Sequence, residues 1–130
     1  MNKKGFTLIE TIMVIAILAL LMLILVPNVI SLINKNNIKS CQNLEASIKN
    51  AAKVYVANNK YQLGFNCPDN NSTSKINVKL QSLVNSGNLK VEGELTNPVT
   101  EGTIDLNSVV EVTYNCKNKD FTYVFSLDCE

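Results

Sequence analysis

A long apolar run near the N-terminus decides most of what this chain can become. No charged residue occurs from Thr11 to Asn34, and every residue from Ile12 to Val26 is apolar. As an α-helix, the segment from Ile12 to Ile33 is about 33 Å long, enough to cross a hydrocarbon layer of roughly 30 Å. The sequence therefore predicts a membrane helix.

The residues before this run predict its orientation. Lys3 and Lys4 precede it, and because basic residues stay on the cytoplasmic side, the chain after Asn34 is expected outside. A cleaved secretory signal peptide followed by a soluble domain is the alternative, since it shares the basic start and the apolar stretch. Three features favour a retained helix: the length of the run, the lack of a small-x-small cleavage motif after Val26, and Glu10 ahead of it.

The helix is expected to continue beyond Asn34. Apolar residues there recur every three or four positions, which predicts one buried helical face: Ile38, Cys41, Leu44, Ile48, Ala51, Ala52 and Tyr55. A single helix should therefore extend from Phe6 to about Asn59. Pro27 lies inside it and removes a backbone hydrogen bond, so we expect a kink or a locally melted turn between Leu23 and Pro27. A helix end at Pro27 is the alternative.

The middle of the chain is mostly irregular in its pattern. Residues 61–74 are rich in turn-forming residues and predict a loop. Residues 77–86 carry Leu80, Leu83 and Val84 on one face, and Gly87 follows them, which predicts a short helix with a left-handed cap. Residues 89–102 are expected to form a loop that can include one short strand.

Apolar and polar residues alternate near the C-terminus. The alternation extends over residues 110–116 and again over residues 121–127, with Lys117 to Asp120 between them. This predicts a β-hairpin with Asn118 and Lys119 at its tip. The apolar face of a hairpin needs a cover, and the apolar stripe of the long helix is available, so the fold class should be α+β.

Composition excludes several functions. The net charge of +1 is scattered along the chain, so no basic surface for nucleic acid is expected. The chain has no histidine and no paired carboxylates of the kind used in acid–base catalysis, so we predict that it is not an enzyme and needs no cofactor. Without histidine or a Cys-x-x-Cys pair, no metal site is expected either.

Four cysteines follow the apolar run: Cys41, Cys67, Cys116 and Cys129. They predict two disulfides in an oxidising, extracytoplasmic space. In the hairpin, Cys116 lies beside the turn and Cys129 at the far end, about 26 Å away, whereas a disulfide needs α-carbons within about 7 Å. Pairing of Cys116 with Cys129 is therefore disfavoured. Cys41 can pair with Cys116 or Cys129, and Cys67 takes the other.

The residues Lys3-Lys4-Gly5-Phe6-Thr7-Leu8-Ile9-Glu10, followed at once by the apolar run, resemble the start of type IV prepilins, pseudopilins and competence pilins. The resemblance implies cleavage between Gly5 and Phe6 by a membrane prepilin peptidase and methylation of the new Phe6 amino group. It implies a leader of residues 1–5, a membrane-spanning and filament-core half of the helix at residues 6–34, and an extracytoplasmic head at residues 35–130. It also implies a pilin-like α+β fold, with the long helix packed on a small C-terminal antiparallel sheet.

Glu10 is the charged residue for which the resemblance implies a role. A charge inside a membrane costs about 2.5 to 3.5 kcal/mol, so such residues tend to be paired. In the family, the partner is the amino group of the first mature residue, here Phe6, on a neighbouring subunit. Two alternatives stay open: a pair with Phe6 of the same chain, four residues away on one helical face, or simple complementation of the helix dipole.

The resemblance implies a structural subunit of a type IV pilus or pilus-like filament. Its partners would be identical or related pilin subunits, the prepilin peptidase, the cytoplasmic membrane and the pilus assembly machinery. It would be a single-pass precursor in that membrane with its head outside, and then part of a cell-surface filament. A pseudopilin of a secretion system and a competence pilin are alternatives, as is, outside the family, a membrane-anchored extracellular binding protein.

Overall fold

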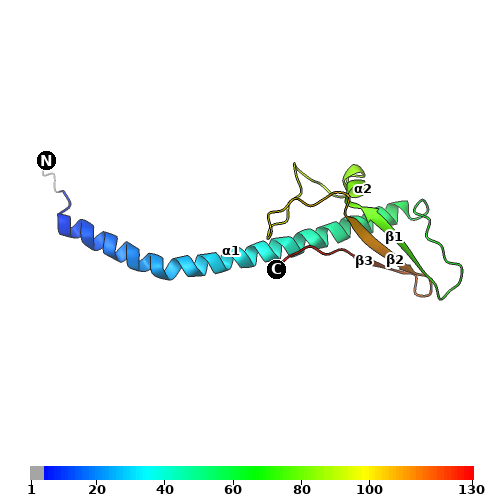
Figure 1. Ribbon diagram of the computed structural model, residues 1–130, viewed down its shortest axis with the longest axis horizontal. Helices are drawn as coiled ribbons and strands as arrows, with labels where there is room; N and C mark the ends of the chain where they lie inside the picture. The colour runs from blue at the N-terminus through cyan, green and yellow to red at the C-terminus, as the bar shows by residue number, and fades with distance from the viewer. Residues whose placement is uncertain (1–4) are drawn as a thin grey trace. The chain divides into compact units, whose positions relative to one another are not determined.

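In a computed structural model of the protein, residues 5–130 are described, so Lys3 and Lys4 lie outside the described residues. The elements are α1 (Leu8–Asn59), β1 (Thr73–Lys79), α2 (Leu80–Asn85), β2 (Val109–Asn115) and β3 (Asp120–Val124) (Figure 1). The chain divides into two compact units, one ending at Asn36 and the other comprising Asn37–Glu130. We call the second unit the head.

Helix α1 confirms the expected long helix, with 52 residues and an end at Asn59, but it begins at Leu8. Phe6 and Thr7, which were expected in the helix, precede it, and Thr7 caps it instead. Pro27 lies inside it, and the residues on both sides are helical, so the alternative of a helix end at this position is wrong. The side-chain amide of Asn28 donates a 3.1 Å hydrogen bond to the Ile24 carbonyl, which adds a contact in the turn that proline weakens. The kink itself stays a prediction.

The sheet of the head is antiparallel, with the strands in the order β1, β2, β3. Strands β2 and β3 form the expected hairpin, in which Asn115 is opposite Asp120 and Tyr114 is opposite Phe121. Strand β1 pairs with the other edge of β2, with Ile76 opposite Val112. Strand β3 is therefore at one edge of this sheet.

The core of the head lies where residues 37–59 of α1 meet one face of the sheet. The largest fully buried side chains come from three elements: Cys41, Ile48 and Val56 on α1, Val110 and Val112 on β2, and Leu80 and Leu83 on α2. The apolar stripe of α1 points into this core, as its spacing of three and four residues predicts. This packing confirms the α+β architecture.

Strand β1 corrects the sequence interpretation. Residues 77–86 were expected to be helical, but Asn77 to Lys79 belong to β1, and α2 begins only at Leu80. The last residues of the expected loop, Thr73 and Ser74, are also in the strand. The reason is an alternation that the turn-rich composition hides: Ile76 and Val78 face inward, while Lys75, Asn77 and Lys79 are exposed.

The second strand of the hairpin is shorter than expected. The alternation predicted a strand as far as Leu127, but β3 ends at Val124. Phe125 is buried in the core, and Leu127 packs against the core as well, although neither belongs to the strand. The alternation of apolar and polar residues continues past Val124 because Phe125 and Leu127 face the core while Ser126 faces solvent. We call residues 125–130 the C-terminal tail.

Candidate functional site

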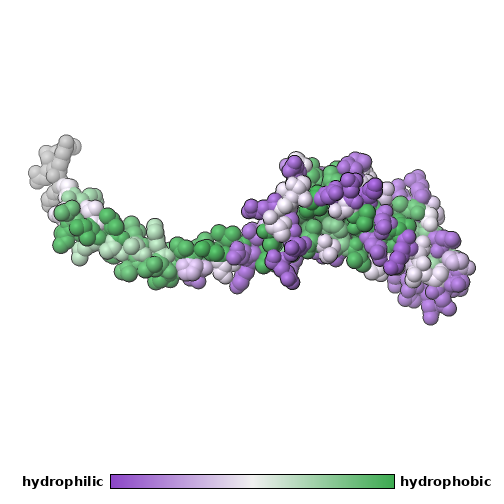
Figure 2. Space-filling model, in the orientation of Figure 1, coloured by the Kyte–Doolittle hydropathy of each residue, from purple (hydrophilic) through white to green (hydrophobic). Residues whose placement is uncertain are grey.

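The part of α1 before the head exposes a continuous apolar surface. Its large apolar side chains from Leu8 to Ile33 are 48% to 80% exposed. The space-filling view shows this part of the helix as mostly green, with a few paler and purple atoms (Figure 2). Among the described residues, α1 is the helix that is long and apolar enough to cross a membrane. Such a surface needs lipid or neighbouring apolar helices around it.

The expected cleavage site lies directly before this helix. Gly5 and Phe6 are exposed and outside regular secondary structure, and the Phe6 side chain is 89% exposed. A side chain added at Gly5 would meet nothing within 4 Å. The peptide bond between them is therefore on an exposed stretch of chain outside regular secondary structure, the kind of segment that proteases cut most readily.

Thr7 and Glu10 cap the start of α1 reciprocally. The Thr7 backbone amide donates to Glu10 Oε2 over 3.1 Å, and the Glu10 amide donates to Thr7 Oγ1 over 3.4 Å. This is a capping box, in which each side chain satisfies an amide that the helix leaves free. The Thr-x-x-Glu spacing that signals it is present in the sequence, but the sequence interpretation used only the charge of Glu10.

An open apolar groove of about 250 Å³ lies beside the Glu10 carboxylate. It is lined by Phe6, Glu10, Thr11, Val14 and Ile15. Among the described residues, the Thr7 amide is the donor to this carboxylate, and no ion pair is formed by it. A cationic group that approaches along this groove can therefore reach a carboxylate in apolar surroundings, where the attraction between charges is stronger than in water.

The four cysteines form two disulfides, Cys41–Cys129 and Cys67–Cys116. This is one of the two arrangements that the hairpin argument left open. The first bond ties the C-terminal tail to α1, and the second ties the loop after α1 to the end of β2. Both cross-link segments that are far apart in sequence, which restricts the unfolded chain.

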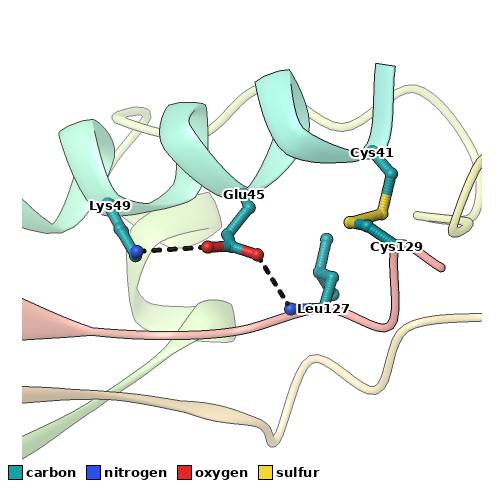
Figure 3. Close-up of polar contacts among 5 residues, drawn as sticks. All are labelled: Cys41, Glu45, Lys49, Leu127 and Cys129. Carbon is teal, nitrogen blue, oxygen red and sulfur yellow. Dashed lines mark hydrogen bonds and ion pairs between the residues drawn. A yellow bond between two sulfur atoms is a disulfide. The ribbon is translucent and has the colours of Figure 1, made fainter. Parts of the chain in front are cut away.

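A carboxylate on α1 supports the first of these cross-links. Glu45 accepts a 3.1 Å hydrogen bond from the Leu127 amide and pairs with Lys49 at 3.1 Å, one helical turn from Cys41 (Figure 3). The Asn97 side chain, which is 6% exposed, donates to the Asp128 carbonyl over 2.8 Å. The tail is therefore held by one covalent bond, which is one of the pairings left open by the sequence, and by polar contacts from two sides, which the sequence interpretation did not predict.

Comparison with known proteins identifies the N-terminal segment. Residues 1–26 match the prokaryotic N-terminal methylation motif. No curated protein and no solved structure matches the chain. The chain therefore carries a type IV pilin-like prepilin signature on an α+β, pilin-like fold. The motif and the apolar half of α1 indicate a structural subunit that is anchored in a membrane as a precursor.

Proposed function

We propose that this protein is a subunit of a type IV pilus or a related filament, cut between Gly5 and Phe6, methylated at Phe6 and assembled through the apolar half of α1. The observation that carries this proposal is the position of Glu10, a carboxylate at the start of an uncovered apolar helix, in a segment that matches the methylation motif. Burying that helix among lipids or copies of itself leaves Glu10 in need of a cation.

The amino group that cleavage creates at Phe6 is the cation we assign to Glu10. The capping box occupies one carboxylate oxygen through Thr7, and the other oxygen is available for the amino group of Phe6 on a neighbouring subunit. The pair neutralises two charges that are both costly in an apolar environment. The same contact repeated from one subunit to the next does not close on itself, and so it produces an open filament.

The first experiment tests whether the protein is a processed, pilin-like filament subunit. Mass spectrometry of the N-terminus, on the sheared-filament and membrane fractions, should find a mature chain that begins at methylated Phe6. Abundance in the sheared fraction would indicate a major subunit, whereas a minor pilin, a pseudopilin or a competence pilin would be scarce there. A chain that stays uncut at Gly5 and never enters a filament would support the membrane-anchored binding protein instead.

The second experiment separates the charge of Glu10 from its capping role. Glu10→Ala should leave cleavage and membrane insertion intact while incorporation into filaments fails, assayed in a strain without the wild-type copy. Glu10→Gln keeps a capping-box residue at this position and removes the charge, so it should fail in the same way. Thr7→Ala keeps the charge and loses the cap, at a cost of about 1 kcal/mol to the helix, and should still assemble. Normal filaments from Glu10→Gln would overturn the charge assignment.

A further inference from the structure

One end of the head is basic. It comprises the last turns of α1, the loop of residues 60–72 and the β2–β3 connection with the first residue of β3, and its lysines are Lys53, Lys60, Lys117 and Lys119. The acidic residues in the same segments are Asp69 and Asp120. We call this region the basic end.

The opposite end of the head is acidic. The loop of residues 89–105 carries Glu92, Glu94, Glu101 and Asp105, against Lys90, and the C-terminal tail adds Asp128 and Glu130. The hydrogen bond from Asn97 to the Asp128 carbonyl holds this loop beside the tail, and the tail is bonded to α1 at Cys41. We call this region the acidic end.

The two ends are well separated along the head. Cys41, which marks the acidic end on α1, is 12 residues before Lys53, a distance of about 18 Å along the helix axis. Figure 1 shows the yellow loop of residues 89–105 and the orange β2–β3 connection at opposite ends of the head. Charges on these two ends of one molecule therefore cannot contact each other.

The charges at both ends lack ion-pair partners within the described chain. In residues 5–130 the ion pairs are Lys49–Glu45 and Lys75–Glu111, neither of which involves the basic or the acidic end. The Lys60 ammonium lies over the rings of Tyr114 and Phe121, at 5.6 and 5.8 Å, and is partly engaged there. Lys53 and Lys119 are exposed and remain available to an external anion.

The basic end is also hollowed. An open groove of about 320 Å³ lies between α1 and β3 and is lined by Lys53, Val56, Ala57, Lys119, Asp120, Phe121 and Tyr123. Lys53 stands on the helix side and Lys119 on the strand side, and Asp120 and apolar side chains line the rest, so the lysines outnumber the carboxylate. A short segment with two carboxylates fits this arrangement of charges.

The acidic loop supplies such a segment. Glu92 and Glu94 are exposed on either side of Gly93, which has a φ of 75°, a left-handed conformation that produces a turn. The turn presents two carboxylates separated by a residue without a side chain, so the backbone can approach another surface closely. Gly93 alone separates Glu92 from Glu94 in the sequence, so no other charged side chain lies between the two carboxylates.

We propose that the head makes a head-to-tail contact with a second copy of this chain, in which the turn Glu92-Gly93-Glu94 of one copy docks into the α1–β3 groove of the next. Lys53 and Lys119 contact its two carboxylates. Because the groove and the turn lie at opposite ends of the head, the contact is heterologous, the type of contact that builds an open filament when the rotation between copies does not close a ring. This inference rests on the proposed filament function and assigns the head a second set of subunit contacts.

Chemical cross-linking of wild-type filaments tests the contact directly. A carbodiimide joins an amine to a carboxylate without a spacer, so it should link Lys53 or Lys119 to Glu92 or Glu94, identified by mass spectrometry of sheared filaments. Links between these residues must join two copies, since they lie at opposite ends of one head. Filaments in which these lysines link only to other carboxylates would overturn the proposal.

Charge reversal provides the matched genetic test. Lys53→Glu with Lys119→Glu should reduce this chain in the sheared fraction about tenfold, which corresponds to about 1.4 kcal/mol, and Glu92→Lys with Glu94→Lys should do the same. The chain with all four substitutions should recover, because the charges match again. Lys79→Glu, at an exposed lysine outside the basic end and the acidic end, should behave like the wild type.

The outcomes distinguish the two proposals. Wild-type filaments together with a four-substitution chain that stays as defective as the double variants would contradict the head-to-tail contact and leave the filament function intact. A wild-type chain that is never found in filaments would contradict the filament function itself. Unchanged membrane levels and intact disulfides in each variant show that a loss of filaments is not a loss of folding.

Discussion

The carboxylate of Glu45 accepts a 3.1 Å hydrogen bond from the backbone amide of Leu127, 82 residues further along the chain. This hydrogen bond is the largest cause of a lowered pKa at Glu45, and the nearby Lys49 ammonium lowers it further, while partial burial opposes both. A carboxylate with a pKa below its ordinary value of 4.5 stabilises the folded state where it is ionised. The C-terminal tail is thus held in part by a titratable group.

Acidification should therefore loosen the tail. Because the folded pKa of Glu45 is lower than the unfolded one, its contribution is complete above about pH 4.5 and is lost as the pH falls through the folded value. The Leu127 amide chemical shift, followed by NMR on the full chain in detergent, should titrate with a midpoint below the ordinary value. Glu45→Gln should abolish this step. A midpoint at or above the ordinary value would contradict the assignment.

Removing the disulfide between α1 and the tail should destabilise the head. We expect the double substitution Cys41→Ser and Cys129→Ser to lower the free energy of unfolding by about 2 to 4 kcal/mol, because the bond closes a long loop in the unfolded chain. Urea denaturation of the full chain, followed by tyrosine fluorescence, measures this. Hydrogen exchange should rise first in residues 125–130. Equal exchange in the tail of both proteins would mean that the polar contacts alone hold it.

A truncation in the core should cost more than the same kind of truncation on the surface of the same helix. Ile48 is 0% exposed, whereas Val54, on the same helix, is 50% exposed. Ile48→Ala should lower the free energy of unfolding by about 2 to 5 kcal/mol, and Val54→Ala by less than about 0.5 kcal/mol. Similar losses from both, in the same urea titration, would contradict the packing of α1 on the sheet.

Gly87 should be sensitive to substitution for a conformational reason. Its φ is 78°, and it follows α2 as a left-handed cap, with its amide 3.1 Å from the Val84 carbonyl. Alanine would clash with nothing, since no atom lies within 4 Å of an added Cβ, so the cost is the left-handed conformation alone, about 1 kcal/mol. Gly102→Ala, where φ is not in that region, is the control and should be nearly neutral in thermal unfolding.

Strong periodic patterns in the sequence predicted most of the fold. The apolar run and the stripe after it predicted α1 as far as Asn59, and the alternation around Tyr114 and Phe121 predicted the hairpin. These patterns are reliable because each element buries one face, which imposes its period on the sequence. Gly87 was likewise predicted as a cap, because few residues tolerate a left-handed backbone.

The missed features depend on partners that no local pattern reveals. Strand β1 was missed because its inward residues are few and it leads directly into α2, so Leu80 and Leu83 drew the interpretation toward a longer helix. The end of β3 was missed because the Leu127 amide bonds to Glu45 instead of to a strand. At the N-terminal end of α1, the prepilin-like motif predicted roles for Phe6 and Glu10. It did not predict the capping role of Thr7, although the Thr-x-x-Glu spacing is a known capping signal.

Because of the Cys41–Cys129 disulfide, cleavage of one peptide bond in a loop of the head does not release a fragment of the chain. A protease acts most readily on exposed loops, and the loops of residues 60–72 and 89–105 both lie between these two cysteines. A chain cut once in either loop remains in one covalent piece, because the C-terminal fragment stays attached through Cys129 to the helix that carries the apolar anchor. After a cut in residues 60–66, the Cys41–Cys129 disulfide alone keeps the fragment attached. A cut in residues 89–105 also lies between Cys67 and Cys116, so both disulfides must then be reduced before the fragment can leave the helix.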